Sequence, residues 1–164
     1  YWGTTNPSDY KYNKDVFTLA VKCASDFITK HENENTDERR AQVAFLQYLL
    51  FQVKNVSPTH YISSNQLVAV IREYLNHRIT KNFLFRRVIA PLRDDGIIIA
   101  SCSHGYKIPV SVEDITTYLN QTHTIVSPML HRVEVCRKLV LENTHGKFDI
   151  LDDPAFIRYK KYFD

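Results

Sequence analysis

The sequence predicts a mainly α-helical fold with one small antiparallel β hairpin. Apolar residues recur at three- and four-residue spacing through most of the 164-residue chain, which is the pattern of amphipathic helices. A short β-branched run at 97–100 is the exception and favours a strand. Gly96 and Gly105 stand on either side of this run, and glycine suits the backbone angles of a helix end and a hairpin turn. We therefore predict helices, a glycine stop and then a hairpin.

The positive charge of the chain belongs to one segment. The whole chain has a formal charge of +3, but residues 36–109 contain ten Lys and Arg against five Asp and Glu, which is +5, and the remainder is −2. Such an asymmetry is expected of a surface that faces nucleic acid. A solvated helix face is the alternative explanation.

Composition argues against several other classes of protein. Cys23, Cys102 and Cys136 are an odd number and form no Cys-x-x-Cys pair, which disfavours a disulfide scaffold and a zinc ribbon and favours a reducing cytoplasm. We find no membrane-length apolar run and no signal-peptide pattern, and we expect no membrane partner and no cofactor. Because the chain begins at Tyr1 and its one methionine is Met129, we expect a piece of a longer polypeptide.

The N-terminal part, 1–35, is predicted as an irregular lead-in at 1–14 and a short helix at 15–30. Six residues are expected on the inner side of that helix: Val16, Leu19, Ala20, Cys23, Phe27 and Ile28. A polar stretch at 31–38 then leads into the next helix, with Asn35 or Thr36 as its cap.

The central part, 36–110, is predicted to begin with a helix that runs to about Lys54. Ser57-Pro58 ends it, 59–62 is expected as a short strand, and Ser63 or Ser64 caps a second helix that stops near Asn76. The inner faces of these two helices are predicted to be formed by Val43, Leu46, Leu50 and Val53, and by Leu67, Ile71, Tyr74 and Leu75.

A four-residue turn at 76–79 leads to a third helix at 80–94, capped by Thr80. Its predicted inner face is Phe85, Val88, Ile89 and Leu92. Two helices joined by such a turn form a helix-turn-helix unit. Pro91 lacks a helical N–H and crowds the carbonyl of Arg87, so a kink is expected in the last turn. Strands at 97–100 and 106–108 with a turn at 101–105 complete the hairpin, which Pro109 ends.

The C-terminal part, 111–164, is predicted as a helical extension. One helix starts at Ser111 and a separate, longer helix covers 122–142, adjusted at Pro128. Asp153-Pro154 is expected to start a last helix, because aspartate caps well and proline suits the first helical position.

Residues 36–109 resemble the winged helix-turn-helix domains of the biotin-repressor and DeoR type. The resemblance rests on ISSNQLVAVIREYL as the second helix, FLFRRVIAPLRDDG as the recognition helix and GIIIASCSHGYKIP as the wing. The chain is also similar to winged-helix modules of phage and bacterial replication or defence proteins, in which a Ser-x-Glu-Asp-Ile helix follows the wing. Pro91 departs from the family pattern.

This resemblance implies binding to double-stranded DNA through the helix at 80–94 and the wing at 97–109. Lys81, Asn82, Arg86 and Arg87 are the expected groove contacts, since asparagine can pair with adenine and arginine with guanine, while lysine attracts phosphate. Solvated arginines are the alternative. Phe83 is expected to point outward, to a thymine methyl or to the later helices.

Further contacts are expected outside the third helix. In the wing, His104 and Lys107 reach a phosphate or the minor groove in this interpretation, with a solvated turn histidine as the alternative for His104. Arg72 and Arg78 flank the turn and are expected on the DNA backbone, or in surface ion pairs. The same phosphate contact is a lower-ranked prediction for Arg39 and Arg40.

Catalysis by this chain is not predicted. Cys102-Ser103-His104 does not place a base behind a nucleophile, and the spacing of His123, His131 and Cys136 is not that of zinc ligands. The leading hypothesis is a DNA-binding domain in regulation, replication or targeting of a larger protein. The second hypothesis is a protein-interaction or homodimerisation module that uses the C-terminal helices. The third is the C-terminal targeting domain of a nuclease or other DNA enzyme.

The second hypothesis depends on apolar residues after position 111, which could instead cover the core of the winged module. They are Ile115, Tyr118, Leu119, Ile125, Met129, Leu130, Val133 and Leu139.

Overall fold

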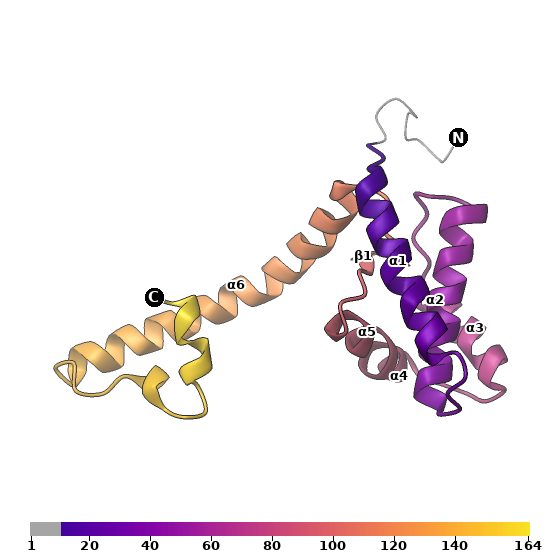
Figure 1. Ribbon diagram of the computed structural model, residues 1–164. Helices are drawn as coiled ribbons and strands as arrows, with labels where there is room; N and C mark the ends of the chain where they lie inside the picture. The colour runs from indigo at the N-terminus through magenta and orange to yellow at the C-terminus, as the bar shows by residue number, and fades with distance from the viewer. Residues whose placement is uncertain (1–10) are drawn as a thin grey trace. The chain divides into compact units, whose positions relative to one another are not determined.

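The computed structural model describes residues 11–164, which divide into two units (Figure 1). The first unit ends at Leu119, and the second is Asn120–Asp164. The structure is mainly helical with one two-stranded antiparallel sheet, as the sequence predicts. Most of the predicted lead-in at 1–14 lies outside the described residues. In the part that the structure describes, no helix has the length and apolar character needed to cross a membrane.

Two long helices open the first unit close to their predicted bounds. Helix α1 is Lys14–His31 and α2 is Asp37–Asn55. Side chains cap both helices: Asn13 accepts the backbone N–H of Val16, and Thr36 accepts that of Arg39. The predicted inward position of Leu19 in α1 is wrong. Leu19 is exposed, because the buried row of α1 runs one position later along the helix, through Ala20, Ala24 and Phe27.

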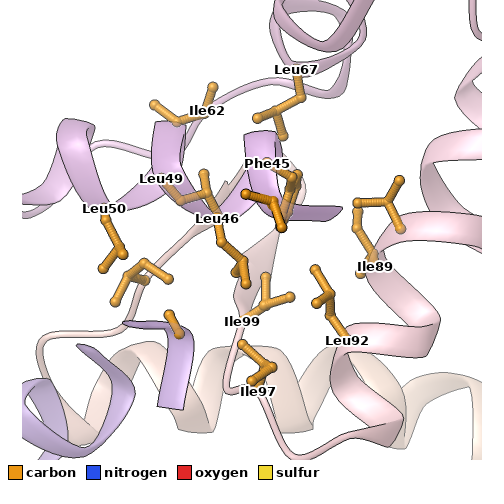
Figure 2. Packing of buried hydrophobic residues seen from close by; sticks show 14 of the residues in the cluster. Phe45, Leu46, Leu49, Leu50, Ile62, Leu67, Ile89, Leu92, Ile97 and Ile99 are labelled. Atoms are coloured by element: carbon orange, nitrogen blue, oxygen red, sulfur yellow. The ribbon is translucent and has the colours of Figure 1, made fainter. Parts of the chain in front are cut away.

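Helix α2 provides the centre of the core (Figure 2). Phe45, Leu46 and Leu49 are almost completely buried and come from successive turns of this helix. Apolar side chains from the later elements pack with them in one continuous cluster: Ile62, Leu67, Ile89, Leu92, Ile97 and Ile99. Since burying one such side chain contributes about 1.5–3 kcal/mol, α2 is the packing centre for the helices and the hairpin at 62–110.

The hairpin is shorter and starts later than predicted. Strand β1 is Ala100–Cys102 and pairs with β2, Gly105–Lys107, through Ala100 opposite Lys107 and Cys102 opposite Gly105. The predicted strand at 97–100 is wrong for its first three residues. Ile97 and Ile99 are buried in the core cluster, so burial rather than strand pairing explains this apolar run.

The predicted strand at 59–62 is reduced to one antiparallel bridge, between Ile62 and Tyr106. The two residues exchange both backbone hydrogen bonds, at 2.8 and 2.9 Å. Gly105 allows this approach: its φ is +145°, and a Cβ atom there would lie 2.0 Å from the carbonyl oxygen of Ile62. The predicted turn glycine is therefore also the place where a second segment touches the hairpin.

The predicted break between two helices after Ser111 is wrong. A single helix, α6, covers Val112–Asn143, and Pro128 lies inside it. Ser111 starts α6 by accepting the backbone N–H of Asp114 at 3.1 Å. The loss of one helical N–H at Pro128 does not end a helix of this length.

The predicted helix at Asp153-Pro154 is also wrong. Asp153 accepts the backbone N–H of Ala155 at 2.8 Å and so forms a turn. The described elements on either side are short 3-10 helices, η3 at Ile150–Asp152 and η4 at Ile157–Tyr162.

The two predicted glycine positions make a matched pair for a stability test. A Cβ atom at position 96 would meet open space, but the φ of +86° is unfavourable for alanine. We therefore expect Gly96→Ala to lower the free energy of unfolding by about 1–2 kcal/mol. Gly105→Ala must also displace the backbone at Ile62, and we expect a loss of about 4 kcal/mol or more. Urea unfolding followed by circular dichroism measures both, and equal losses would contradict the close approach.

Candidate nucleic-acid interface

The helix predicted at 80–94 is formed by three consecutive segments. They are α4 (Lys81–Phe83), a π-helical segment η2 (Leu84–Ile89) and α5 (Ala90–Asp94). Thr80 caps the helix by accepting the N–H of Phe83 at 3.0 Å. At the other end Gly96 has a positive φ, and the N–H of Ile97 bonds the carbonyl of Leu92 while that of Gly96 bonds Arg93. These bonds are the Schellman helix end that the glycine predicts.

Pro91 explains the wide turn. It offers no N–H to the carbonyl of Arg87, four residues earlier, and its ring crowds that oxygen. The helix widens just before the proline, where the N–H of Ala90 bonds the carbonyl of Phe85, five residues back. Gln42 of α2 then donates its side-chain N–H to the free Arg87 carbonyl at 2.8 Å. The predicted disturbance at Pro91 is therefore present, but it lies before the last turn and α2 stabilises it.

The widened turn changes which aromatic residue faces inward. Leu84, Val88, Ile89 and Leu92 are buried. Phe85, predicted to face inward, is 41% exposed, whereas Phe83, predicted to point outward, packs against the core. Both predictions are wrong, because they assume an uninterrupted α-helical phase through the segment.

The outward face of this helix carries the four predicted groove contacts. Lys81, Asn82 and Arg86 are exposed, and the structure gives them no ion pair within the described residues. Arg87 is also exposed, but its guanidinium lies 3.3 Å from the carboxylate of Glu38 in α2. An exposed pair of this kind contributes little, so Arg87 can exchange Glu38 for another anion.

Three more predicted residues lie in exposed turns or helix ends. Arg72 is in the last turn of α3, Ser64–Leu75; Arg78 is in the turn before Thr80, and His104 is at the tip of the hairpin. By contrast, Arg39 and Arg40 have protein neighbours. Arg39 bonds Gln42 at 3.1 Å, and Arg40 lies over the ring of Tyr74.

The hairpin lies beside the helix through aromatic and cationic contacts. The rings of Phe85 and Tyr106 are 6.2 Å apart, and the guanidinium of Arg93 lies 5.9 Å from the ring of Tyr106 and 3.9 Å from that of Tyr118. Arg93 also donates to the carbonyl of Ile99 at 2.7 Å. Burial lowers the pKa of Arg93, an effect that the two tyrosines oppose. Arg93 thus holds the hairpin against the helix end.

Lys107 does not fit its predicted role as a phosphate contact. Its side chain is only 3% exposed, and its ammonium donates to the carboxylate of Asp114 in α6 at 2.5 Å. Asp114 also accepts the N–H of Val110 at 3.0 Å and the hydroxyl of Tyr61 at 3.4 Å. Burial lowers the pKa of Lys107, and Asp114 acts in the opposite direction. Lys107 therefore anchors α6 to the hairpin.

Sequence reasoning missed Arg93, Gln42 and the exposed ring of Phe85. Only Pro91 gives a usable signal, because a proline in a helix leaves the carbonyl four residues earlier in need of a donor. Gln42 is that donor, and it is 45 residues from Arg87 in the sequence. No periodicity in the sequence relates positions so far apart.

Cys102 ends β1, and His104 lies in the hairpin turn that follows it. The backbone N–H of His104 points to the sulfur of Cys102 at 3.3 Å, so this proximity is part of the hairpin turn. Within residues 11–164, no group of three or more His, Cys, Asp or Glu side chains is placed to hold a metal ion. No protein family, curated protein or solved structure is found to match the chain.

Gln42 and Pro91 can be tested together. Gln42→Leu removes the donor to the Arg87 carbonyl, and we expect a loss of about 1–3 kcal/mol. In a Pro91→Ala background the helix regains a backbone donor, so the same change should cost about 1 kcal/mol less. Unfolding free energies of the four proteins measure this coupling, and equal losses in both backgrounds would contradict it.

The buried ion pair provides a second test. Lys107→Met leaves the Asp114 carboxylate without its cation, and we expect a loss of about 3–5 kcal/mol. Adding Asp114→Asn removes the uncompensated charge and should restore part of the lost stability. Thermal unfolding of both variants measures the difference. If Lys107→Met alone were as stable as the unchanged chain, the ion pair would not contribute to stability.

Proposed function

We propose that this chain binds double-stranded DNA through the outward face of the helix Lys81–Asp94, with the hairpin beside it as a wing. One observation supports this function above the others. The helix buries Leu84, Val88 and Leu92 on one side and leaves Lys81, Asn82 and Arg86 exposed on the other. A helix held in this way presents its polar face for insertion into the major groove.

The order of elements supports the same proposal. Helix α2, the bridged segment at Ile62, helix α3, the helix at 81–94 and the hairpin follow one another along the chain. Ile62 forms one antiparallel bridge with Tyr106 of β2, so the short segment before α3 lies against the hairpin. This order is the one that the resemblance to winged helix-turn-helix domains implies. Figure 1 shows α3 and α4 in succession next to α2.

The exposed side chains suit the two kinds of DNA contact, those to phosphates and those to base edges. Lys81, Arg72 and Arg78 suit phosphate contacts around the turn at 76–79, whereas Asn82 and Arg86 can read adenine and guanine edges. Phe85 adds an apolar surface between the helix and the hairpin, where a thymine methyl group can pack. If four or five phosphates are neutralised, we expect a log–log salt slope of roughly −4 to −5.

Fluorescence anisotropy on labelled random-sequence duplex DNA across a salt series tests this function. The double change Lys81→Ala and Arg86→Ala should weaken binding about tenfold to a hundredfold and reduce the salt slope by about 1, because Lys81 is the one of the two assigned to a phosphate. Both side chains are exposed, so the fold should not be affected.

A matched control is Lys138→Ala, which removes an exposed cation from the second unit. It should leave affinity and salt slope nearly unchanged. Absence of binding at low salt, or an equal loss in the control, would contradict DNA binding by this face. A variant Asn82→Ala that loses preference for one sequence while still binding random DNA would assign base reading to that residue.

A further inference from the structure

We infer that the 3-10 helix η4, Ile157–Tyr162, binds single-stranded DNA, with bases stacked on its tyrosines and phosphates paired with its cations. The site is the tyrosine–cation surface, defined here as Arg158, Tyr159, Lys161 and Tyr162. It lies wholly in the second unit, so the inference does not rest on the proposed duplex binding by the helix at 81–94.

The 3-10 geometry of η4 places like side chains in rows. In a helix with three residues per turn, residues three positions apart lie on the same side. Tyr159 and Tyr162 therefore form one row, and Arg158 and Lys161 form the row next to it. The backbone has the hydrogen bonds of this helix type, since the N–H of Tyr159 bonds the carbonyl of Phe156, three residues earlier, at 2.9 Å.

Each cation of the surface is close to the ring of the tyrosine that follows it. The guanidinium of Arg158 is 5.4 Å from the ring centre of Tyr159, and the ammonium of Lys161 is 5.2 Å from that of Tyr162. The two tyrosines are 44% and 62% exposed, and both cations are exposed as well. A ring with a cation beside it offers a stacking face for a base and a charge for the neighbouring phosphate.

The positive charge of this surface has no acidic counterpart next to it in the sequence. Residues 154–163 contain three Lys and Arg and no Asp or Glu. One of the three, Lys160, is paired with Asp152 at 2.7 Å. The structure gives Arg158 and Lys161 no ion pair within the described residues. An anionic ligand is therefore the complementary partner of the surface.

Ion pairs hold η4 in place without using these two cations. Arg137 of α6 binds Asp149 at 2.9 Å and Asp164 at 3.0 Å, so the chain is fixed on both sides of η4. In Figure 1 this C-terminal segment folds back along the last turns of α6. The nearby carboxylates thus serve the fold, and the tyrosine–cation surface is presented by an anchored element.

The spacing of the rings favours a single strand over a duplex. With a rise of about 2.0 Å per residue, positions three residues apart are about 6 Å apart along the helix axis. Bases of a duplex are only about 3.4 Å apart along each strand, and their neighbours cover their faces. Unstacked bases of a single strand expose those faces to aromatic rings. The surface has no carboxylate or amide for a ribose 2′-hydroxyl, so DNA rather than RNA is the expected strand.

Fluorescence anisotropy of the full chain with a labelled oligothymidine of about twelve nucleotides tests the inference. A ring-removing variant, Tyr159→Leu with Tyr162→Leu, should weaken binding at least about tenfold. The matched ring-retaining variant, Tyr159→Phe with Tyr162→Phe, should bind within about twofold of the unchanged chain, because it can still stack. Arg158→Gln with Lys161→Gln should reduce the salt slope by about 1.4, because each phosphate contact on a single strand contributes about 0.7.

The same measurements separate this site from the proposed duplex site. The ring-removing variant should leave duplex binding nearly unchanged, and Lys81→Ala with Arg86→Ala should leave oligothymidine binding nearly unchanged. Failure of one proposal therefore does not decide the other. Circular dichroism checks that the variants keep their helical content.

Absence of oligothymidine binding at low salt would overturn the inference, and so would equal affinities of the ring-removing and ring-retaining variants. Tighter binding of an oligouridine of the same length would overturn the assignment to DNA. Vesicles of anionic phospholipid that bind the chain in place of oligothymidine would identify a membrane surface instead, because cations and tyrosines also suit lipid headgroups.

Discussion

The first unit depends on the partly buried carboxylate of Asp114. It receives the ammonium of Lys107 from the hairpin, the N–H of Val110 from the chain before α6 and the hydroxyl of Tyr61 from the segment next to Ile62. Removing two charges from water is unfavourable unless both are paired and hydrogen-bonded. Lys107 is buried and the Asp114 side chain is only 13% exposed, so this pair stabilises the arrangement of the hairpin and the start of α6.

A second constraint shapes the proposed recognition helix. Pro91 leaves the Arg87 carbonyl without a helical donor, and Gln42 supplies one from α2. The π-helical turn that results moves Phe85 out of the core and towards Tyr106 of the hairpin. The polar face of the helix and the hairpin are thereby held next to each other by the same local distortion. Wide turns of this kind are frequent at functional sites.

The proposed DNA-binding face lies in the first unit. The helix at 81–94 offers exposed cations and an asparagine, which suit an anionic polymer with readable base edges.

The sequence by itself determined the first helices of the chain, their caps and the two glycine positions. Thr36, Ser63 and Thr80 accept the N–H groups that their positions predict, and Gly96 and Gly105 adopt positive φ angles, because these features depend on local backbone chemistry. Only the tertiary structure decided the burial of Lys107, the exposure of Phe85 and the donor role of Gln42. Each depends on a residue from another element, and contacts between distant segments leave no period in the sequence.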